Sequence, residues 1–269
     1  MGKIIVLAAG KGGTGKTVLT AALGERLAAR GKQVCLVDAC AGLRGLDLCF
    51  DLQDKVVFDW LDLIKNDCPM EQALLRCMGE GDKSLSLLPA PQDVLPEEID
   101  ISQLFKLLMR LQKRFDYVLL DSPSGIGNLT RSLCAAADEI LLTSTPDDAA
   151  KRCTERICSL LRENGSNADI SLTVLVNQGA AGFRKSSDRL TASSVSAWAA
   201  YLDLPLLAYV HLDVAIADMD VRKKAVVKGA KSSQWLSVVD RIADRLCGSD
   251  TPLKQDRVRR KLWLSHKKG

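Results

Sequence analysis

The residues with the clearest chemical potential form a glycine-rich loop near the N-terminus. It reads Gly10-Lys11-Gly12-Gly13-Thr14-Gly15-Lys16-Thr17, fits the pattern G-x-x-x-x-G-K-[ST], and is followed by Val18 and a helical pattern. Glycines let such a loop wrap so that backbone N–H groups point at phosphate oxygens, and the next helix adds its positive end. Lys16 can reach β- and γ-phosphates, and the Thr17 hydroxyl can ligate Mg²⁺. The loop therefore predicts a site for a nucleoside triphosphate, expected to be ATP, with Mg²⁺.

A strand-end aspartate is the candidate for a second anchor of the metal. Residues 115–121 form an apolar run that ends in Asp121. Phosphoryl transfer needs an acid near Mg²⁺ or its waters, and ligands of open α/β sheets lie beyond the carboxyl ends of the strands. Residues 122–127, which follow, could sense the γ-phosphate through backbone N–H groups. The sequence therefore predicts that Asp121 faces the phosphate loop.

Short apolar runs alternate with helical patterns along the chain. The runs are bracketed by Gly, Asp, Pro or Asn, and they read as strands buried on both faces. They cover residues 4–9, 34–38, 85–88, 117–121, 139–143, 172–176 and 206–210. The helical patterns include residues 19–30, 101–114, 148–162, 187–201 and 233–246. This alternation predicts an α/β fold with a doubly wound, mostly parallel sheet flanked by helices.

Composition predicts one globular domain with a basic arm. Hydrophobic residues make up 47% of the 269 residues, so the chain can bury one large core. Residues 251–269 carry seven Lys/Arg against one acid, although the net charge of the whole chain is only +4. No apolar run reaches the ~18 residues of a membrane span, and no signal-peptide pattern is found. We expect a cytosolic chain with an ATPase domain over 1–247, a linker over 248–256 and a basic amphipathic tail over 257–269.

The nine cysteines are scattered, and no two of them form a C-x-x-C pair. In a cytosolic protein of this size, such cysteines are expected to be small buried hydrophobes rather than metal ligands or disulfides.

The second lysine of the loop, Lys11, carries a more specific signal. The sequence KGGTGKT resembles the signature of the MinD/ParA family of deviant-Walker P-loop ATPases. The resemblance implies that Lys11 reaches across a nucleotide-sandwich homodimer to the partner's phosphates. A cation supplied in this way neutralises charge that develops on the γ-phosphoryl group, so ATP should favour the dimer.

Other segments resemble the MinD branch of this family. Residues 37–48 are similar to a switch segment close to DxDxGLRNLDL, and residues 56–59, 88–90 and 121–126 also match. ParA proteins more often carry a DPQGN-type segment after the second strand. The resemblance also implies that Asn177 reads the adenine edge, since an amide donates and accepts at once.

Two positions depart from the family pattern. Cys40 stands where members usually carry a second acid that helps to position or activate the attacking water. A thiol is a weak acceptor with a reference pKa of about 8.5, so we expect slow hydrolysis and a long-lived ATP dimer unless Asp38 takes over this role. His211 replaces a usual proline and is interpreted as a structural substitution.

The basic tail resembles the amphipathic membrane-targeting helix that ends MinD proteins. Val258 and Leu262 share a helix face, and Trp263 and Leu264 flank it. Cations near anionic headgroups contribute about 1 kcal/mol each, so one tail should bind weakly and two tails of a dimer by avidity. A solubilising tail and a nucleic-acid-binding tail are the alternatives.

The expected function is an ATPase switch that cycles between cytosol and inner membrane and positions the division site. Its expected partners are a second copy of the chain, an anionic membrane surface, a MinC-like inhibitor and a MinE-like activator. A ParA-like DNA segregation ATPase and a flagellar-number regulator remain alternatives. The DNA alternative rests on a cationic cluster formed by Arg222, Lys223, Lys224, Lys228 and Lys231.

The predicted site residues fall into four groups. The catalytic group is Lys11, Lys16, Asp38 and Asp121. The nucleotide-binding group is Gly10, Lys11, Gly12, Gly13, Thr14, Gly15, Lys16, Thr17, Val18 and Asn177. The metal group is Thr17, Asp38 and Asp121. The membrane group is Val258, Leu262, Trp263 and Leu264.

Overall fold

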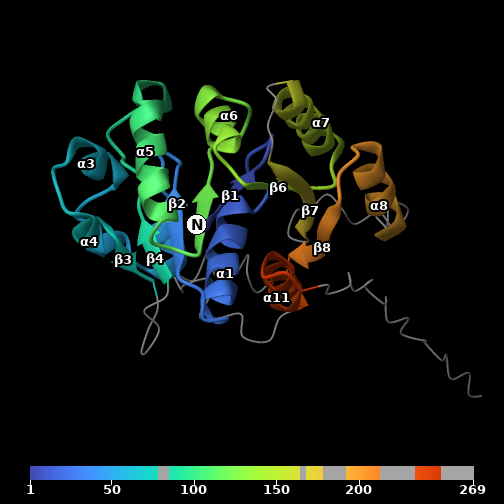
Figure 1. Ribbon diagram of the computed structural model, residues 1–269. Coiled ribbons are helices and arrows are strands. Elements are labelled where there is room, and N and C mark those ends of the chain that lie inside the picture. The colour runs from blue at the N-terminus through green and yellow to red at the C-terminus, as the bar shows by residue number, and fades with distance from the viewer. Residues whose placement is uncertain (78–84, 164–167, 178–191, 213–233, 250–269) are drawn as a thin grey trace, which may run out of the picture.

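A mostly parallel sheet runs through the molecule, with helices on both of its faces (Figure 1). The computed structural model describes residues 1–77, 85–163, 168–177, 192–212 and 234–249. Within these residues the sheet has eight strands in the order β3-β4-β2-β5-β1-β6-β7-β8. All neighbouring strands pair in parallel except β3 and β4, which are antiparallel. The predicted fold class is therefore confirmed.

The elements have the following bounds. The strands are β1 (Lys3–Ala8), β2 (Val34–Asp38), β3 (Leu75–Arg76), β4 (Leu85–Leu88), β5 (Tyr117–Asp121), β6 (Glu139–Ser144), β7 (Asp169–Asn177) and β8 (Leu206–Leu212). The helices are α1 (Lys16–Ala28), α2 (Leu46–Phe50), α3 (Trp60–Lys65), α4 (Met70–Ala73), α5 (Ile101–Gln112), α6 (Asn128–Ala135), α7 (Asp148–Glu163), α8 (Ala192–Tyr201) and α11 (Gln234–Leu246). Two short 3₁₀ turns, η1 (Gln53–Lys55) and η2 (Pro96–Glu98), lie between them.

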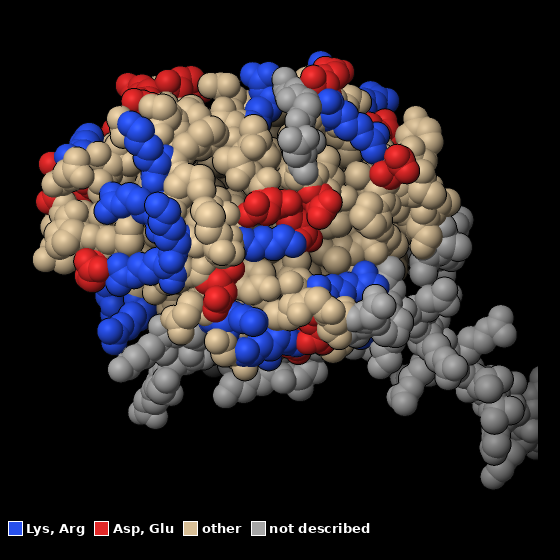
Figure 2. Space-filling model, in the orientation of Figure 1, with Lys and Arg blue, Asp and Glu red and all other residues tan. Residues whose placement is uncertain are grey.

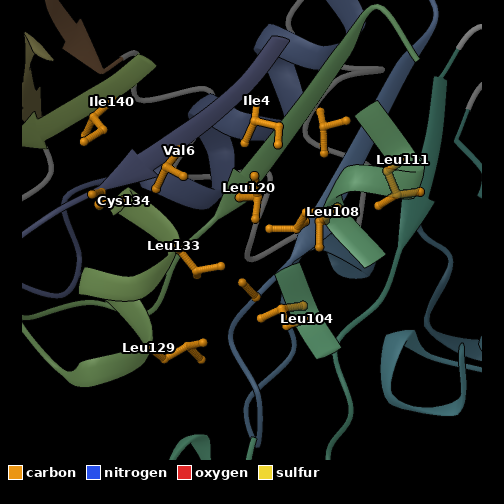
Figure 3. Close-up of a cluster of buried hydrophobic side chains, with 14 of the residues drawn as sticks. Ile4, Val6, Leu104, Leu108, Leu111, Leu120, Leu129, Leu133, Cys134 and Ile140 are labelled. Carbon is orange, nitrogen blue, oxygen red and sulfur yellow. The ribbon is translucent and has the colours of Figure 1, made fainter. Parts of the chain in front are cut away.

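The sheet separates two hydrophobic cores. Successive strand residues point to opposite faces, so in β1 the side chains of Ile4 and Val6 enter one core, and those of Ile5 and Leu7 the other. Helices α5, α6, α7 and α8 cover the first core, part of which Figure 3 shows, and α1 and α11 cover the second. Both faces of the central strands are therefore buried, which explains why the sequences of these strands are continuous apolar runs.

All seven predicted strands are present, but β3 was not predicted and several boundaries differ. Helix α1 begins at Lys16, three residues before the predicted 19–30 pattern, because its first turn is built from the polar end of the phosphate loop. It ends at Ala28, and Gly31 then takes a left-handed φ of 75°. The short helices α2, α3, α4 and α6 were not predicted, since they span too few turns to show a helical period. The first residues of the predicted 187–201 and 233–246 helices lie outside the described residues.

Leu108 of α5 provides a direct test of the first core. Its side chain is 1% exposed and packs in the cluster drawn in Figure 3, whereas its neighbour Met109 is 43% exposed. Leu108→Ala should lower the free energy of unfolding by about 2–5 kcal/mol through lost burial and a residual cavity. Met109→Ala is the matched control, and it should change stability by no more than about 0.5 kcal/mol. Urea denaturation of both variants measures the difference, and equal losses would contradict the assignment of the core.

Candidate functional site

Three adjacent strands end together at the edge of the sheet where the phosphate loop begins. Strand β5 lies between β2 and β1, and Asp121 is aligned with Asp38 on one side and Leu7 on the other. The loop leaves β1 directly after this level and enters α1 at Lys16. Residues from three separate parts of the chain are therefore brought to one point, as the sequence predicted.

The loop is fixed to the sheet and to α7 by close contacts. Thr14 is buried, and its hydroxyl lies 3.1 Å from that of Thr143 at the end of β6. A Cβ on Gly10 would lie 2.5 Å from the carbonyl oxygen of Cys153, so only glycine fits there. Gly15 has a left-handed φ of 85° where the loop becomes helix. The loop thus has a defined shape before any ligand binds.

Lys16 lies inside the site rather than in solvent. Its side chain comes from the first turn of α1, the residue is 7% exposed, and its amine donates to the hydroxyl of Ser124 at 3.0 Å. Ser124 belongs to the predicted γ-phosphate-sensing segment 122–127, which Gly125 ties to the end of β1 through an N–H bond to the carbonyl of Ala9 at 2.8 Å. The amine is therefore held next to the phosphate loop by a weak neutral acceptor that a phosphate oxygen could replace.

The two carboxylate oxygens of Asp121 differ in their hydrogen bonding. Its Oδ2 accepts a 2.6 Å hydrogen bond from the Thr17 hydroxyl, whereas the buried Oδ1 has no hydrogen-bond partner among the residues that the structure describes. Burial raises the pKa of Asp121 to about 7, although the Lys16 amine acts to lower it. A buried carboxylate with a free oxygen beside a threonine hydroxyl fits a divalent cation, so Thr17 and Asp121 could hold Mg²⁺ here.

Asp38 organises the segment that follows β2. The carboxylate is fully buried and accepts backbone N–H bonds from Cys40 at 2.9 Å, Gly45 at 2.7 Å and Leu46 at 2.9 Å. Burial raises its pKa, and these three N–H groups oppose the rise. Its main-chain carbonyl accepts from the indole of Trp60 at 2.8 Å. Asp38 therefore closes residues 39–46 into a turn around its own carboxylate.

Cys40 lies between the two aspartates. Its thiol contacts the carbonyl oxygen of Asp121 at 3.6 Å. Burial raises the pKa of the Cys40 thiol, and the carboxylates of Asp121 and Asp38 raise it further. The thiol is therefore neutral near pH 7 in the nucleotide-free protein and is a poor base. Ligand atoms of Asp38, Cys40 and Asp121 all lie within 4.8 Å of one another.

Lys11 does not point into its own phosphate loop. Its amine pairs with Asp147 at 3.0 Å, and 45% of its side chain is exposed. Asp147 also accepts from the Thr145 hydroxyl and from the backbone N–H of Ala150 at the start of α7. Partial burial acts to raise the pKa of Asp147, but the hydrogen bonds from Thr145 and Lys11 outweigh it and lower the pKa to about 2. Asp147 was not predicted, because an acid between a strand and a helix is a common capping residue.

The side chains of some predicted residues lie outside the described part of the chain. Asn177 lies at the carboxyl end of β7, beside Leu212 of β8, but its side chain and that of His211 lie outside the described residues. The tail residues Val258, Leu262, Trp263 and Leu264 lie outside them as well. The same holds for the cationic cluster of Arg222, Lys223, Lys224, Lys228 and Lys231.

Comparison with known proteins identifies the family. The model of a family described as an AAA domain matches residues 2–174. The chain is 31% identical over 254 residues to the septum site-determining protein MinD of Bacillus subtilis, covering 94% of this chain and 92% of that protein. The chain belongs to the MinD family. The resemblance stated from the KGGTGKT loop is thus confirmed, and with it the assignment to the P-loop ATPases.

Solved MinD structures share the fold over almost the whole chain. A chain of the MinC:MinD cell division protein complex from Aquifex aeolicus is 30% identical, with a TM-score of 0.78 and coverage of 94% of this chain and 99% of that one. The cell division ATPase MinD of Pyrococcus furiosus is 26% identical, with a TM-score of 0.75 and coverage of 92% and 99%. The relation to the MinD family therefore extends well beyond the phosphate loop.

The surface of this MinD-family chain carries charge unevenly. Figure 2 shows Lys and Arg side chains in a line over α5, whose exposed cations include Lys106 and Arg110. Among the described residues, no helix combines the length and apolarity that crossing a membrane requires.

The pH dependence of folding tests the environment of Asp121. The folded-state pKa of about 7 lies above the ordinary carboxyl value of about 4, so the folded protein binds this proton more readily than the unfolded chain. Stability of the nucleotide-free protein should therefore fall as pH rises from about 4 to 7. Asp121→Asn removes this ionisation, and its stability relative to the wild type should increase between about pH 4 and 7 in urea denaturation. A difference that stays constant with pH would contradict the assigned environment.

Proposed function

We propose that this chain is an ATP-dependent dimerising switch of the MinD type that cycles between cytosol and inner membrane and positions the division site. The observation that carries the proposal is the geometry of Lys11. Its amine is partly exposed beside the phosphate loop, and its ion-pair partner among the described residues is Asp147. A half-exposed ion pair of this kind contributes about 0–1 kcal/mol, so Lys11 can exchange Asp147 for a phosphate of a partner protomer at small cost.

The nucleotide would sit against the loop Gly10–Thr17, with Lys16 leaving Ser124 for its β- and γ-phosphates. Thr17 and Asp121 would hold the accompanying Mg²⁺, which neutralises phosphate charge when bound. Binding would place a further positive charge beside the buried Oδ1 of Asp121, which accepts no hydrogen bond from the described residues. We also propose that Asn177 contacts the adenine, on the basis of its place at the end of β7.

Exposed apolar side chains around the site support a dimer interface. Leu43 is 81% exposed on the segment that Asp38 organises, and Leu48 is 60% exposed on α2, which follows it. Ile126 is 41% exposed on the segment that carries Ser124. Apolar groups gathered around a binding site are typical of a contact surface. A second copy that covers them would bring its own Lys11 to the γ-phosphate, so ATP and dimerisation would be coupled.

Hydrolysis in this dimer should be slow. The Asp38 carboxylate already accepts three hydrogen bonds from backbone N–H groups. The neutral thiol of Cys40 is a poor proton acceptor. Neither group is well placed to activate water strongly. A slow reaction would keep the chain in its ATP-bound, dimeric state until a MinE-like or other activator intervenes.

The tail over 257–269 would link the dimer to the membrane. Its cations and the apolar residues Val258, Leu262, Trp263 and Leu264 suit an anionic lipid surface. A single tail is weak, and two tails joined by the dimer bind by avidity. A MinC-like inhibitor is the proposed binding partner of the dimer, since one structural relative is a MinC:MinD complex.

Lys11→Ala tests the coupling between ATP and dimerisation. Wild-type chain with ATP and Mg²⁺ should elute as a dimer in size-exclusion chromatography with light scattering, and Lys11→Ala as a monomer. Lys113→Ala, which removes an exposed lysine at the end of α5, is the control and should leave the dimer intact. A Lys11→Ala variant that still dimerises would refute the role of this residue.

Cys40→Asp tests the cause of slow turnover. Restoring a carboxylate should raise steady-state ATP hydrolysis at least about tenfold, because general-base catalysis typically contributes about 10²–10⁴-fold. Cys40→Ser keeps the size of the side chain without its acidity and should bring no such gain. If the wild type already hydrolyses ATP briskly and the aspartate adds nothing, the proposed effect of Cys40 is wrong.

Deletion of residues 254–269 tests membrane targeting. The intact chain should pellet with phosphatidylglycerol-containing vesicles in ATP but not in ADP, and pure phosphatidylcholine vesicles should bind much less. The deleted variant should stay in the supernatant while still forming the ATP dimer. Unchanged pelleting of the deleted variant would exclude the tail as the anchor, and an ATP-dependent shift of DNA instead would favour the ParA-like alternative.

A further inference from the structure

Three potential metal-binding side chains converge beside the phosphate loop. Ligand atoms of Asp38, Cys40 and Asp121 lie within 4.8 Å of one another. Two ligands of one tetrahedral ion at about 2.0 Å and 2.3 Å are themselves about 3.5 Å apart. The cluster is therefore slightly wider than a closed zinc-like site, and adjustments of about 1 Å would close it.

The two carboxylates retain the lone pairs that a metal needs. Asp121 is 1% exposed, and within the described part of the chain its buried Oδ1 has no hydrogen-bond partner. In Asp38, Oδ2 accepts two backbone N–H groups, and Oδ1 accepts that of Cys40. The Cys40 thiol also hydrogen-bonds to the Asp38 carboxylate, and this bond ends when a metal displaces the thiol proton. Once the thiol proton leaves, one lone pair on Asp38 and both on the Oδ1 of Asp121 are available to a cation. An unpartnered, buried carboxylate oxygen is costly unless a positive charge or a donor fills the space beside it.

Cys40 gives this cluster a different chemical character from an all-oxygen site. Mg²⁺ prefers six oxygen ligands in a nearly ideal octahedron, whereas thiolate sulfur favours Zn²⁺ and similar softer ions. The Cys40 thiol is next to Asp121, since its sulfur lies 3.6 Å from the main-chain carbonyl of that residue. One soft and two hard donors fit a tetrahedral ion with one position left for water or a phosphate oxygen.

We infer that Cys40, Asp121 and Asp38 form a mixed sulfur–oxygen site that binds a thiophilic divalent cation of the Zn²⁺ class directly. On binding, the Cys40 S–H bond breaks, a sulfur–metal bond forms, and the proton passes to solvent, with no change of oxidation state. The inference rests on the proposed nucleotide site and deepens it. The cation would occupy the place beside Asp121 proposed above for Mg²⁺, and a phosphate oxygen could complete its coordination. It does not require nucleotide, because all three donors belong to the protein.

Cobalt provides the direct probe of the sulfur ligand. Co²⁺ added to the nucleotide-free, full-length protein should produce a thiolate-to-cobalt charge-transfer band in the near ultraviolet, and Zn²⁺ should bleach it by displacement. Cys40→Ser should lose the band, and Asp121→Asn should weaken Co²⁺ binding at least about tenfold. Cys68→Ser and Cys247→Ser remove two of the more accessible thiols and are the matched controls that should keep the band.

The outcomes separate this inference from the proposed function. A band that is absent from the wild type, or that survives in Cys40→Ser, overturns the mixed-ligand site. Loss of the band in Cys68→Ser or Cys247→Ser instead would place the metal elsewhere and overturn it as well. ATP-dependent dimerisation with Mg²⁺ is measured separately on wild-type protein without added Co²⁺ or Zn²⁺, and its failure would count against the switch alone.

Discussion

The buried carboxylate of Asp121 is the constraint on which the rest of the site depends. One oxygen accepts a hydrogen bond from Thr17, and the other is buried and accepts none from the described residues. Burial of this carboxylate raises the free energy of the nucleotide-free protein. The Lys16 amine and the Thr17 hydroxyl offset part of that cost, and a proton or a metal cation would offset more of it. The phosphate loop lies beside it, so the ligand that fills the loop can also bring the missing charge. The loop that binds the ligand and the carboxylate that destabilises the ligand-free protein therefore lie side by side.

Asp38 and Lys11 extend this arrangement in two directions. Asp38 folds the segment 39–46 around its carboxylate, so the exposed Leu43 is presented next to the nucleotide site by backbone hydrogen bonds rather than by a rigid helix. Lys11 is paired with Asp147 on the opposite side, through a contact weak enough to exchange. A ligand that rearranges the phosphate loop can therefore change two features that a second copy would contact. These are the apolar surface around Leu43 and the amine of Lys11 once it leaves Asp147.

Sequence patterns predict the parts of this site that backbone chemistry fixes. The loop 10–17 is defined by glycines, and the strands that end in Asp38 and Asp121 are defined by short apolar runs, so their convergence follows from the parallel fold. The pairing of Lys11 with Asp147 and the three N–H bonds to Asp38 could not be predicted, because they depend on how loops from distant strands pack. Short helices such as α3 were also missed, although Asp59 and Asp62 form a capping box at its start. The role of Cys40 is intermediate: its position shows in the sequence, whereas its contact with Asp121 appears only in the structure.

The central claim is that a triphosphate, and not a diphosphate, completes the charge balance between two copies of the chain. Sedimentation velocity of the purified protein with Mg²⁺ and ATP, with Mg²⁺ and ADP, and without nucleotide measures this directly. The account predicts a dimer with ATP and a monomer in the other two samples. A single species in all three samples, or an equal shift with ADP, would contradict it.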